Sequence, residues 1–219
     1  YLSLISISVF LGHLFPFWLK FKGGKGIAVL IGILFGLSYL YGTFYLLLSI
    51  LLKKKDPRNL GSKNIGATNI TRINGWKLGL LTLILDILKS FIPVKICYIF
   101  YPDYLSLISI SVFLGHLFPF WLKFKGGKGI AVLIGILFGL SYLYGTFYLL
   151  SWLLIAYIFK YSSLAAIISS ISIYLFTLIQ EDINYSWLIF FFNVFIFFKH
   201  KENIRRLFNK TESKIKFKK

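Results

Sequence analysis

The 219-residue chain contains no methionine, a single cysteine and only seven acidic residues. One cysteine, Cys97, excludes an internal disulfide bond and a metal site built from several cysteines. Charged residues of both signs make up 15% of the chain, whereas hydrophobic residues make up 58% and the mean hydropathy is +0.78. A soluble core of this length cannot bury so much apolar surface, so the composition predicts an integral membrane protein.

The 25 basic residues give a net charge of +18, which on a soluble protein would suggest a nucleic-acid partner. Here they lie in short clusters between apolar runs and not along one soluble face, so we expect no nucleic acid. Lys and Arg are typical of cytoplasmic loops, and all of them except Lys89 and Lys95 fall in segments that we place on that side. We therefore expect the N-terminus outside and the C-terminus inside.

Residues 104–150 repeat residues 1–47 without one substitution. Duplicated segments normally diverge, so this identity indicates either a very recent duplication or an error in the assembly of the sequence. The absence of methionine, including an initiator, also counts against the first copy. We therefore interpret residues 1–47 as an added copy and residues 48–219 as the functional domain.

Apolar segments recur along the whole chain, most of them near the spanning length of about 17–25 residues. They cover residues 1–17, 27–52, 78–100, 104–121, 130–159, 163–179 and 186–198. Lysines flank residues 130–159 at both ends, so both ends should lie on one side, and two short helices broken around Ser141 satisfy this. The sequence predicts an all-α, polytopic transmembrane helix bundle, with six spans after residue 50 and extra helices from the repeat.

Three polar clusters lie on the expected cytoplasmic side, and the first two are rich in small and basic residues. The first, residues 61–72, contains Ser62, Asn64, Asn69 and Arg72. It suits close packing around a polar ligand, with a solvated connector as the alternative. The second contains Lys123 and the turn Gly126, Gly127, Lys128 and Gly129. Consecutive glycine N–H groups can converge on a phosphate, but the spacing is not a Walker motif, which makes a nucleotide site an unfavourable interpretation.

The third cluster spans residues 200–212. If it is helical, His200, Asn203 and Arg206 share one face, although a basic membrane-surface tail is the simpler interpretation of this segment alone. Between the first two clusters, Asp86 and Lys89 are i, i+3 neighbours in an apolar segment and are expected to pair.

In order and spacing, these clusters and the Leu85-Asp86-Ile87-Leu88-Lys89 stretch resemble the PlsY family, the acyl-phosphate-dependent glycerol-3-phosphate acyltransferases of bacterial membranes. The resemblance covers the chain from roughly residue 50 onward. It implies a seven-helix membrane fold, in which acyl phosphate and glycerol 3-phosphate give lysophosphatidic acid and phosphate, the first step of phospholipid synthesis. It also implies no cofactor, no metal and an active face on the cytoplasmic side of the inner membrane.

Both substrates of such an enzyme carry phosphate and need cations and backbone donors, and the acyl carbonyl needs a hydrogen-bond donor as charge develops on it. The expected catalytic residues are Ser62, Arg72, His200 and Asn203, and the expected substrate-binding residues are Asn64, Asn69, Lys123, Gly126, Gly127, Lys128, Gly129 and Arg206. Ser62 lacks a recognisable triad and is expected to donate a hydrogen bond, not to act as a nucleophile. The base is either His200 or the phosphate of the donor.

Some features depart from the family or fit other classes. Lys63 and Lys210 stand where the family usually has glycine, and the repeat occupies the place of the usual first helix. An acyltransferase that uses coenzyme A would usually show a His-x-x-x-x-Asp pair, which neither His116 nor His200 provides. A transporter or channel for a small anion is the non-enzymatic alternative. It would place its polar groups near mid-membrane, where only Asp86 and Lys89 are expected.

Overall fold

The computed structural model describes residues 60–62, 64–119 and 123–215, and the regular structure in these ranges is helical. The helices are α3 (Ala67–Asn74), α4 (Trp76–Phe100), α5 (Leu105–Leu117), α6 (Ile130–Leu140), α7 (Tyr142–Phe159), α8 (Ser162–Ile179) and α9 (Ile183–Phe208), with a 3₁₀ turn, η2 (Pro102–Tyr104), before α5. All six segments predicted after residue 50 are confirmed as helices. The first repeat copy and the helices expected from it lie outside the described residues.

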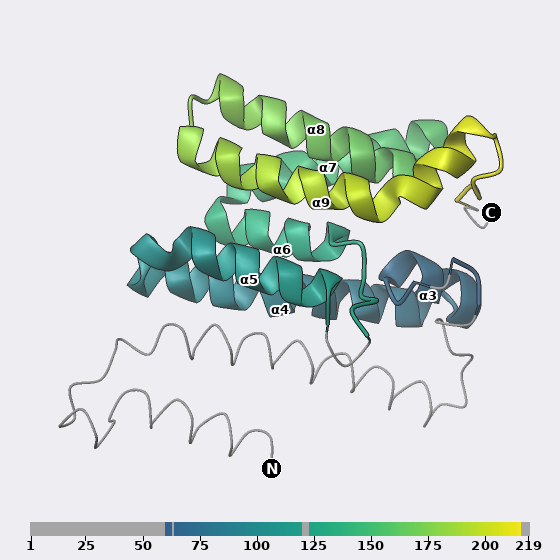
Figure 1. The fold of residues 1–219 in the computed structure, drawn as a ribbon, viewed down its shortest axis with the longest axis horizontal. Coiled ribbons are helices and arrows are strands. Elements are labelled where there is room, and N and C mark those ends of the chain that lie inside the picture. Colours follow the sequence, from purple (N-terminus) through teal and green to yellow (C-terminus); the bar gives the residue numbers. More distant parts are fainter. Residues whose placement is uncertain (1–59, 63, 120–122, 216–219) are drawn as a thin grey trace, which may run out of the picture.

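Helices α4 to α9 lie side by side and alternate in direction along the chain (Figure 1). Helices α4, α5 and α6 form one group, α7, α8 and α9 form a second, and α6 packs against both α4 and α7. Because six passes return the chain to the end where it began, the C-terminus of α9 comes back to the end that carries α3. This topology brings the three polar clusters together.

The predicted break in the longest apolar segment is confirmed. Helix α6 ends at Leu140, helix α7 begins at Tyr142, and Ser141 between them has an extended backbone with φ −155° and ψ 130°. Gly145 packs so closely against Phe138 that a Cβ at position 145 would overlap the phenyl ring. The two helices therefore form a tight hairpin.

Two helix ends differ from the apolar segments, and one helix was not expected. Helix α5 ends at Leu117 and not near residue 121, because Pro119 has no N–H and disfavours a helical residue before it. Helix α9 continues to Phe208, well beyond the apolar segment that ends at residue 198, so the third polar cluster is indeed helical. Helix α3 was not predicted, because the polar residues around it resemble a turn.

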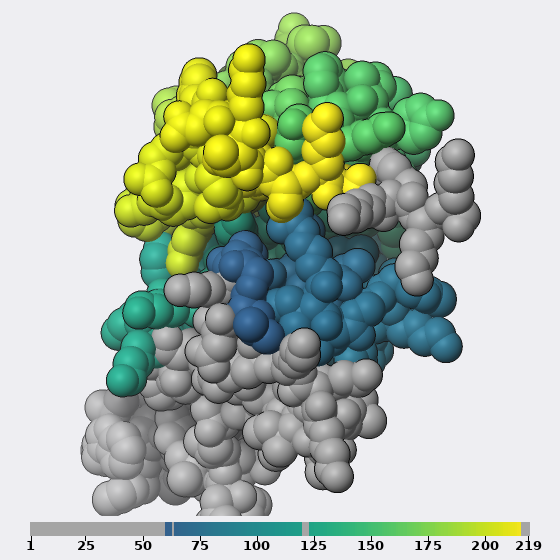
Figure 2. Space-filling model, turned by 90° about the vertical axis from the view of Figure 1, so that its right-hand side faces the viewer, coloured from purple at the N-terminus to yellow at the C-terminus, as the bar shows by residue number. Residues whose placement is uncertain are grey.

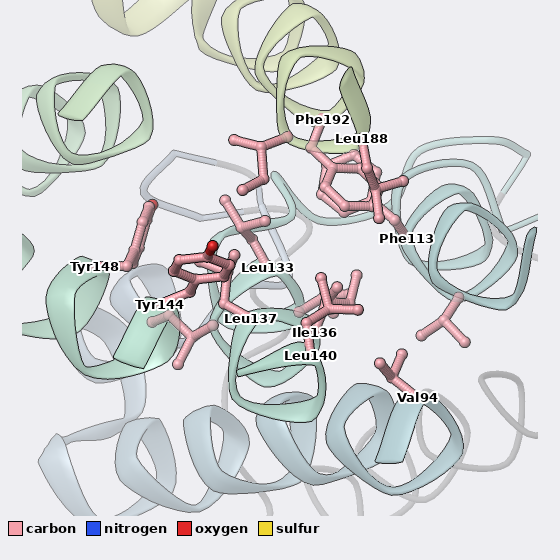
Figure 3. Close-up of a cluster of buried hydrophobic side chains, with 14 of the residues drawn as sticks. Val94, Phe113, Leu133, Ile136, Leu137, Leu140, Tyr144, Tyr148, Leu188 and Phe192 are labelled. Carbon is pink, nitrogen blue, oxygen red and sulfur yellow. The ribbon is translucent and has the colours of Figure 1, made fainter. Parts of the chain in front are cut away.

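The core centres on α6, whose sequence is apolar on every side. Such a helix is stable only when surrounded by other helices, and residues 132–137 are all buried. Figure 3 shows Leu133, Ile136 and Leu137 of α6 in the buried cluster that also holds Phe192 of α9. At Gly135 and Gly139 a Cβ would overlap atoms of α4, so the two glycines allow close packing of the kind seen between membrane helices.

The outer surface of the bundle is apolar. Large exposed side chains include Leu150, Leu153 and Leu154 on α7 and Leu175 and Ile179 on α8. Of the described helices, α7 and α8 are long and apolar enough to cross a membrane by length and composition. Their exposed faces are suited to contact with lipid.

Candidate active site

The three polar clusters meet at one end of the bundle. Figure 2 views this end and shows the C-terminal segment against α3 and the start of α4. Arg72 of α3 donates from Nη2 to the backbone oxygen of Ser213 at 3.4 Å, across 141 positions of sequence. The hydroxyls of Thr68 and Ser162, 3.3 Å apart, connect α3 to the start of α8. The first polar cluster therefore contacts both the segment after α9 and the start of α8.

Glu212 lies at the centre of this end and is only 8% exposed. Its Oε1 accepts hydrogen bonds from Asn203 Nδ2 at 2.7 Å and Ser163 Oγ at 2.8 Å, and its Oε2 accepts from Arg206 Nε at 2.6 Å. Burial raises the pKa of Glu212, but the hydrogen bonds from Asn203, Arg206 and Ser163 and the charge of Arg206 outweigh burial, so the pKa lies below its ordinary value. The carboxylate is therefore charged at neutral pH and fixes three donors.

Lys128 approaches this group from the turn before α6. Its Nζ donates to Asn203 Oδ1 at 2.5 Å. Burial lowers the pKa of Lys128 from 10.5 to about 8; the charge of Glu212 opposes this shift, and the charges of Arg206 and Arg72 add to it. Because its Oδ1 accepts from Lys128 and its Nδ2 donates to Glu212, Asn203 holds both side chains in place, and its Nδ2 carries a second N–H beyond the one given to Glu212.

His200 lies one turn before Asn203 on α9 and is 3% exposed. Its Nδ1 is 2.8 Å from the backbone oxygen of Ile196, and because a carbonyl can only accept, Nδ1 carries the proton. In a neutral ring Nε2 then has the lone pair. The predicted shared face of His200, Asn203 and Arg206 is confirmed by their common helix and by the burial of His200 and Asn203.

The loop before α3 is organised by Asn69. Its Oδ1 accepts from the N–H of Ser62 at 2.9 Å, and its Nδ2 donates to the backbone oxygens of Leu60 at 3.2 Å and Asn64 at 2.8 Å. Asn64 Oδ1 in turn accepts from the N–H of Gly66 at the start of α3. Asn69, expected to bind substrate, is instead 2% exposed and engaged with the loop. It fixes the backbone on which the exposed Ser62 lies.

The glycine turn does not present all its N–H groups to an anion. The N–H groups of Gly126 and Gly127 donate to the backbone oxygens of Leu117 and His116, at 3.2 Å each. These glycines are required by packing, because a Cβ on Gly126 would overlap the Pro119 ring and a Cβ on Gly127 would overlap the His116 imidazole. Gly129 has φ +88° and begins α6.

Within the described part of the chain, the N–H groups of Lys128 and Gly129 have no backbone acceptor. They lie at the N-terminus of α6, where unpaired N–H groups favour an anion. Lys123, the first described residue of the loop, is exposed, and the structure gives its side chain no contact with the buried group. Of the backbone N–H groups that the sequence predicted to bind phosphate, those of Lys128 and Gly129 therefore stay available, whereas those of Gly126 and Gly127 do not.

Sequence reasoning did not assign roles to Glu212, Ser163 and Lys199. Lys199 Nζ donates to the backbone oxygen of Leu117 at 2.6 Å and lies 4.3 Å from the centre of the Phe118 ring, so α9 also holds the end of α5. Two signals for Glu212 were available: acidic residues are rare in this chain, and residue 212 ends the third polar cluster. For Ser163 and Lys199 no pattern distinguished them from other serines and lysines.

The expected pair in α4 is confirmed, since Lys89 Nζ is 2.5 Å from Asp86 Oδ1. Lys89 also lies 2.8 Å from Nδ1 of His116, which connects α4 to α5. Among the described residues, no group of three or more His, Cys, Asp or Glu side chains is arranged to hold a metal ion.

Comparison with known proteins places these features in one family. The family model described as glycerol-3-phosphate acyltransferase matches residues 1–52 and residues 37–210. The chain is 45% identical over 181 residues to the glycerol-3-phosphate acyltransferase of Pelagibacter ubique (strain HTCC1062), covering 82% of this chain and 94% of that protein. The corresponding protein of Coxiella burnetii (strain Dugway 5J108-111) is 38% identical over 184 residues, covering 82% of this chain and 95% of its own length.

Two solved structures have the same fold. One is the crystal structure of PlsY (YgiH), an integral membrane glycerol 3-phosphate acyltransferase, in its glycerol 3-phosphate form. It has a TM-score of 0.77 and 36% identity, and the match covers 85% of this chain and 96% of the other. The lysophosphatidic acid form has a TM-score of 0.73 and 35% identity, with 84% and 94% covered.

Proposed function

Because the chain belongs to the glycerol-3-phosphate acyltransferase family and shares the fold of an integral membrane member, we propose that it transfers a fatty acyl group from acyl phosphate to the 1-hydroxyl of glycerol 3-phosphate. The products are lysophosphatidic acid and inorganic phosphate. The observation that carries the site assignment is the meeting of Lys128, Arg206 and Arg72 around Asn203 and Glu212 at one end of the bundle.

The cations at this end suit two phosphate-bearing substrates. Arg206 and Lys128 are fixed through Glu212 and Asn203, and Arg72 makes one 3.4 Å bond to a backbone oxygen that a phosphate can replace. Fixed donors lose little conformational entropy when a phosphate binds. The N–H groups of Lys128 and Gly129 add the positive end of α6 to the same site.

The chemical step needs no covalent enzyme intermediate, because acyl phosphate is already activated. The 1-hydroxyl oxygen attacks the acyl carbon, a new C–O bond forms, and the bond from the acyl carbon to the phosphate oxygen breaks with its electron pair leaving on phosphate. The hydroxyl proton goes either to Nε2 of His200, whose lone pair the Ile196 contact leaves available, or to the departing phosphate. The hydroxyl of Ser62 is suited to donate to the acyl oxygen, because nothing in the described structure engages it.

The active end faces the cytoplasm in this proposal, and the membrane is the bacterial inner membrane. The support is the distribution of charge. Basic residues gather at the end that holds Arg72, Lys128 and Arg206, whereas the turns at the other end contain Asp103, Glu181 and Asp182. Both substrates are then available from the cytoplasmic side and from the adjoining lipid leaflet.

The second copy of the repeat is the working one in this proposal, and residues 48–219 form the acyltransferase domain. The support is that Lys128 belongs to the second copy and bonds to Asn203, while the Gly126 and Gly127 N–H groups bond to α5 of the same copy. The corresponding first-copy residues, including Lys25, precede the first polar cluster in the chain.

The transporter alternative is not favoured. Its support was the pair of charges inside α4, but Asp86 and Lys89 pair with each other and Lys89 also lies 2.8 Å from His116 Nδ1, so this pair is not open to a passing ion. The remaining charged residues that contact one another, including Glu212 and Arg206, lie at one end of the bundle.

The test is acyl transfer from palmitoyl phosphate to glycerol 3-phosphate by the purified chain, with palmitoyl coenzyme A as the alternative donor. A second form replaces residues 1–47 by a family-like first helix. We expect lysophosphatidic acid and phosphate from acyl phosphate alone. Activity in both forms makes the repeat a tolerated insertion, and activity only in the replaced form assigns the chemistry to residues 48–219. Folded protein that is inactive in both forms contradicts the proposal.

A further inference from the structure

Three titratable side chains, one buried and two largely buried, lie beneath the glycine turn and take no part in the proposed chemistry. Lys89 Nζ is 2.5 Å from Asp86 Oδ1 and 2.8 Å from His116 Nδ1, and Asp86 Oδ1 is 3.8 Å from the same ring nitrogen. The side chains of Lys89 and His116 are 9% and 6% exposed. They join α4 to the last turn of α5.

The contact with Lys89 fixes the tautomer of His116. An ammonium group can only donate, so Nδ1 of His116 accepts and the proton of the neutral ring is on Nε2. Nε2 is the ring atom nearest to the position that a Cβ on Gly127 would occupy. The ring is thus held on one side by Lys89 and packs on the other side against the turn.

The turn rests on His116 in two ways. The N–H of Gly127 donates to the backbone oxygen of His116, and the Cα of Gly127 packs on the His116 imidazole without room for a side chain. Lys128 is the next residue in the chain, and its Nζ reaches Asn203 on α9. A displacement of the ring therefore displaces the residue that leads directly into Lys128.

We propose that Asp86, Lys89 and His116 are positioning residues that hold the turn of residues 126–129 so that Lys128 points at Asn203 and at the bound phosphate. This inference rests on the proposed function, because the phosphate is that of the substrate. The network acts through the turn and does not touch the substrate.

The composition of the network supports a positional role. Charges inside an apolar membrane helix are costly, and apolar side chains of similar size often pack at least as stably as a buried ion pair. Lys89 forms directional bonds with Asp86 and His116, and these bonds set the orientation of the imidazole. Apolar packing would define that orientation less narrowly. A network used for position is therefore expected to change kinetics more than stability when it is neutralised as a unit.

The experiment compares Lys89→Gln with Lys95→Gln, the same substitution on the same helix at a lysine whose Nζ, among the described residues, lies over the rings of Tyr98 and Tyr142. Steady-state kinetics give KM and kcat for glycerol 3-phosphate, and hydrogen exchange of the detergent-solubilised protein reports the Gly126 and Gly127 amides. For Lys89→Gln we expect KM to rise about tenfold or more and exchange at the two glycines to accelerate. Lys95→Gln is expected to change neither.

The double variant Asp86→Asn with Lys89→Gln leaves no unpaired buried charge and is used if the single variant does not fold. It is expected to melt within a few degrees of the parent and still show the higher KM and faster glycine exchange. Unchanged KM and unchanged exchange in the folded double variant, or a uniform acceleration of exchange across all helices, overturns the inference. Hydrogen exchange needs no substrate. The exchange measurement therefore still tests whether the network holds the turn, even if the parent proves inactive with glycerol 3-phosphate and the proposed function fails.

Discussion

The ammonium group of Lys128 donates to Asn203 Oδ1 at 2.5 Å, although 75 positions of sequence separate the two residues. The other end of the Asn203 carboxamide donates to Glu212, which also accepts from Arg206. One amide thus fixes two cations relative to one carboxylate. Each substitution at this end of the bundle therefore removes an identified contact, and its effect can be predicted.

Replacement of Lys128 by alanine removes a cation and a hydrogen-bond donor from the phosphate site. We expect KM for glycerol 3-phosphate or acyl phosphate to rise about 10–100-fold, the effect of losing one hydrogen bond to a charged group. Steady-state kinetics with each substrate varied in turn show which phosphate Lys128 binds. The control is Lys125→Ala, an exposed lysine of the same loop. Equal KM values for both variants would remove Lys128 from the site.

The pKa of Lys128 predicts a pH dependence. Since burial lowers this pKa from 10.5 to about 8, Lys128 loses its charge as the pH rises through about 8, and kcat/KM should fall on the alkaline side of that value. A lysine with an ordinary pKa would hold its charge about two units higher. In Lys128→Arg the guanidinium stays charged, so the alkaline decline should disappear even if activity is lower. A decline that persists in the arginine variant would assign the pH dependence to another group.

Replacement of His200 by alanine tests the identity of the base. If Nε2 of His200 accepts the hydroxyl proton, kcat should fall about 10²–10⁴-fold with a smaller change in KM. The matched control is Lys201→Ala, at the next position on the exposed side of α9. A kcat close to that of the parent would instead assign the proton to the phosphate of the acyl donor.

Lys210 occupies a position that favours glycine. It follows α9 with φ +58°, in the left-handed region, where a side chain is strained and where helices often end in glycine. Lys210→Gly should stabilise the fold by about 1 kcal/mol, measured as a higher thermal midpoint in detergent. Lys214→Gly, in the same segment but without a positive φ, should not stabilise the protein. A lower midpoint for Lys210→Gly would show that the lysine side chain compensates for the strain.

Asn69 is expected to stabilise the loop before α3 and to affect catalysis only through that loop. Asn69→Ala removes three hydrogen bonds to the backbone of Leu60, Ser62 and Asn64. Loss of partners for such groups should lower the free energy of unfolding by about 1–3 kcal/mol, together with activity. Thr68→Ala, which removes a longer contact at 3.3 Å, is the control and should cost less. A stable Asn69→Ala variant with only a higher KM would restore the direct substrate-binding role.

The sequence alone determined the membrane class, the six helices after residue 50 and the break near Ser141. Each depends on local properties: the length of an apolar run, the flanking lysines and the composition of a turn. Local reasoning also predicted the Asp86 and Lys89 pair, because two buried charges one helical turn apart in an apolar segment have few other partners. The expectation of a common face for His200, Asn203 and Arg206 likewise needed only the period of a helix.

The tertiary structure decided which of the polar residues act together. Whether Gly126 and Gly127 offer their N–H groups to a ligand depends on where the end of α5 lies, and in the fold its carbonyls take both. The Asn69 amide is of a type that often binds ligands, but in the fold it forms hydrogen bonds with the backbone of its own loop. Glu212 becomes central only because the segment after α9 turns back toward Ser163 and Asn203. Hydrogen-bond partners far apart in sequence are set by helix packing, which no local pattern encodes.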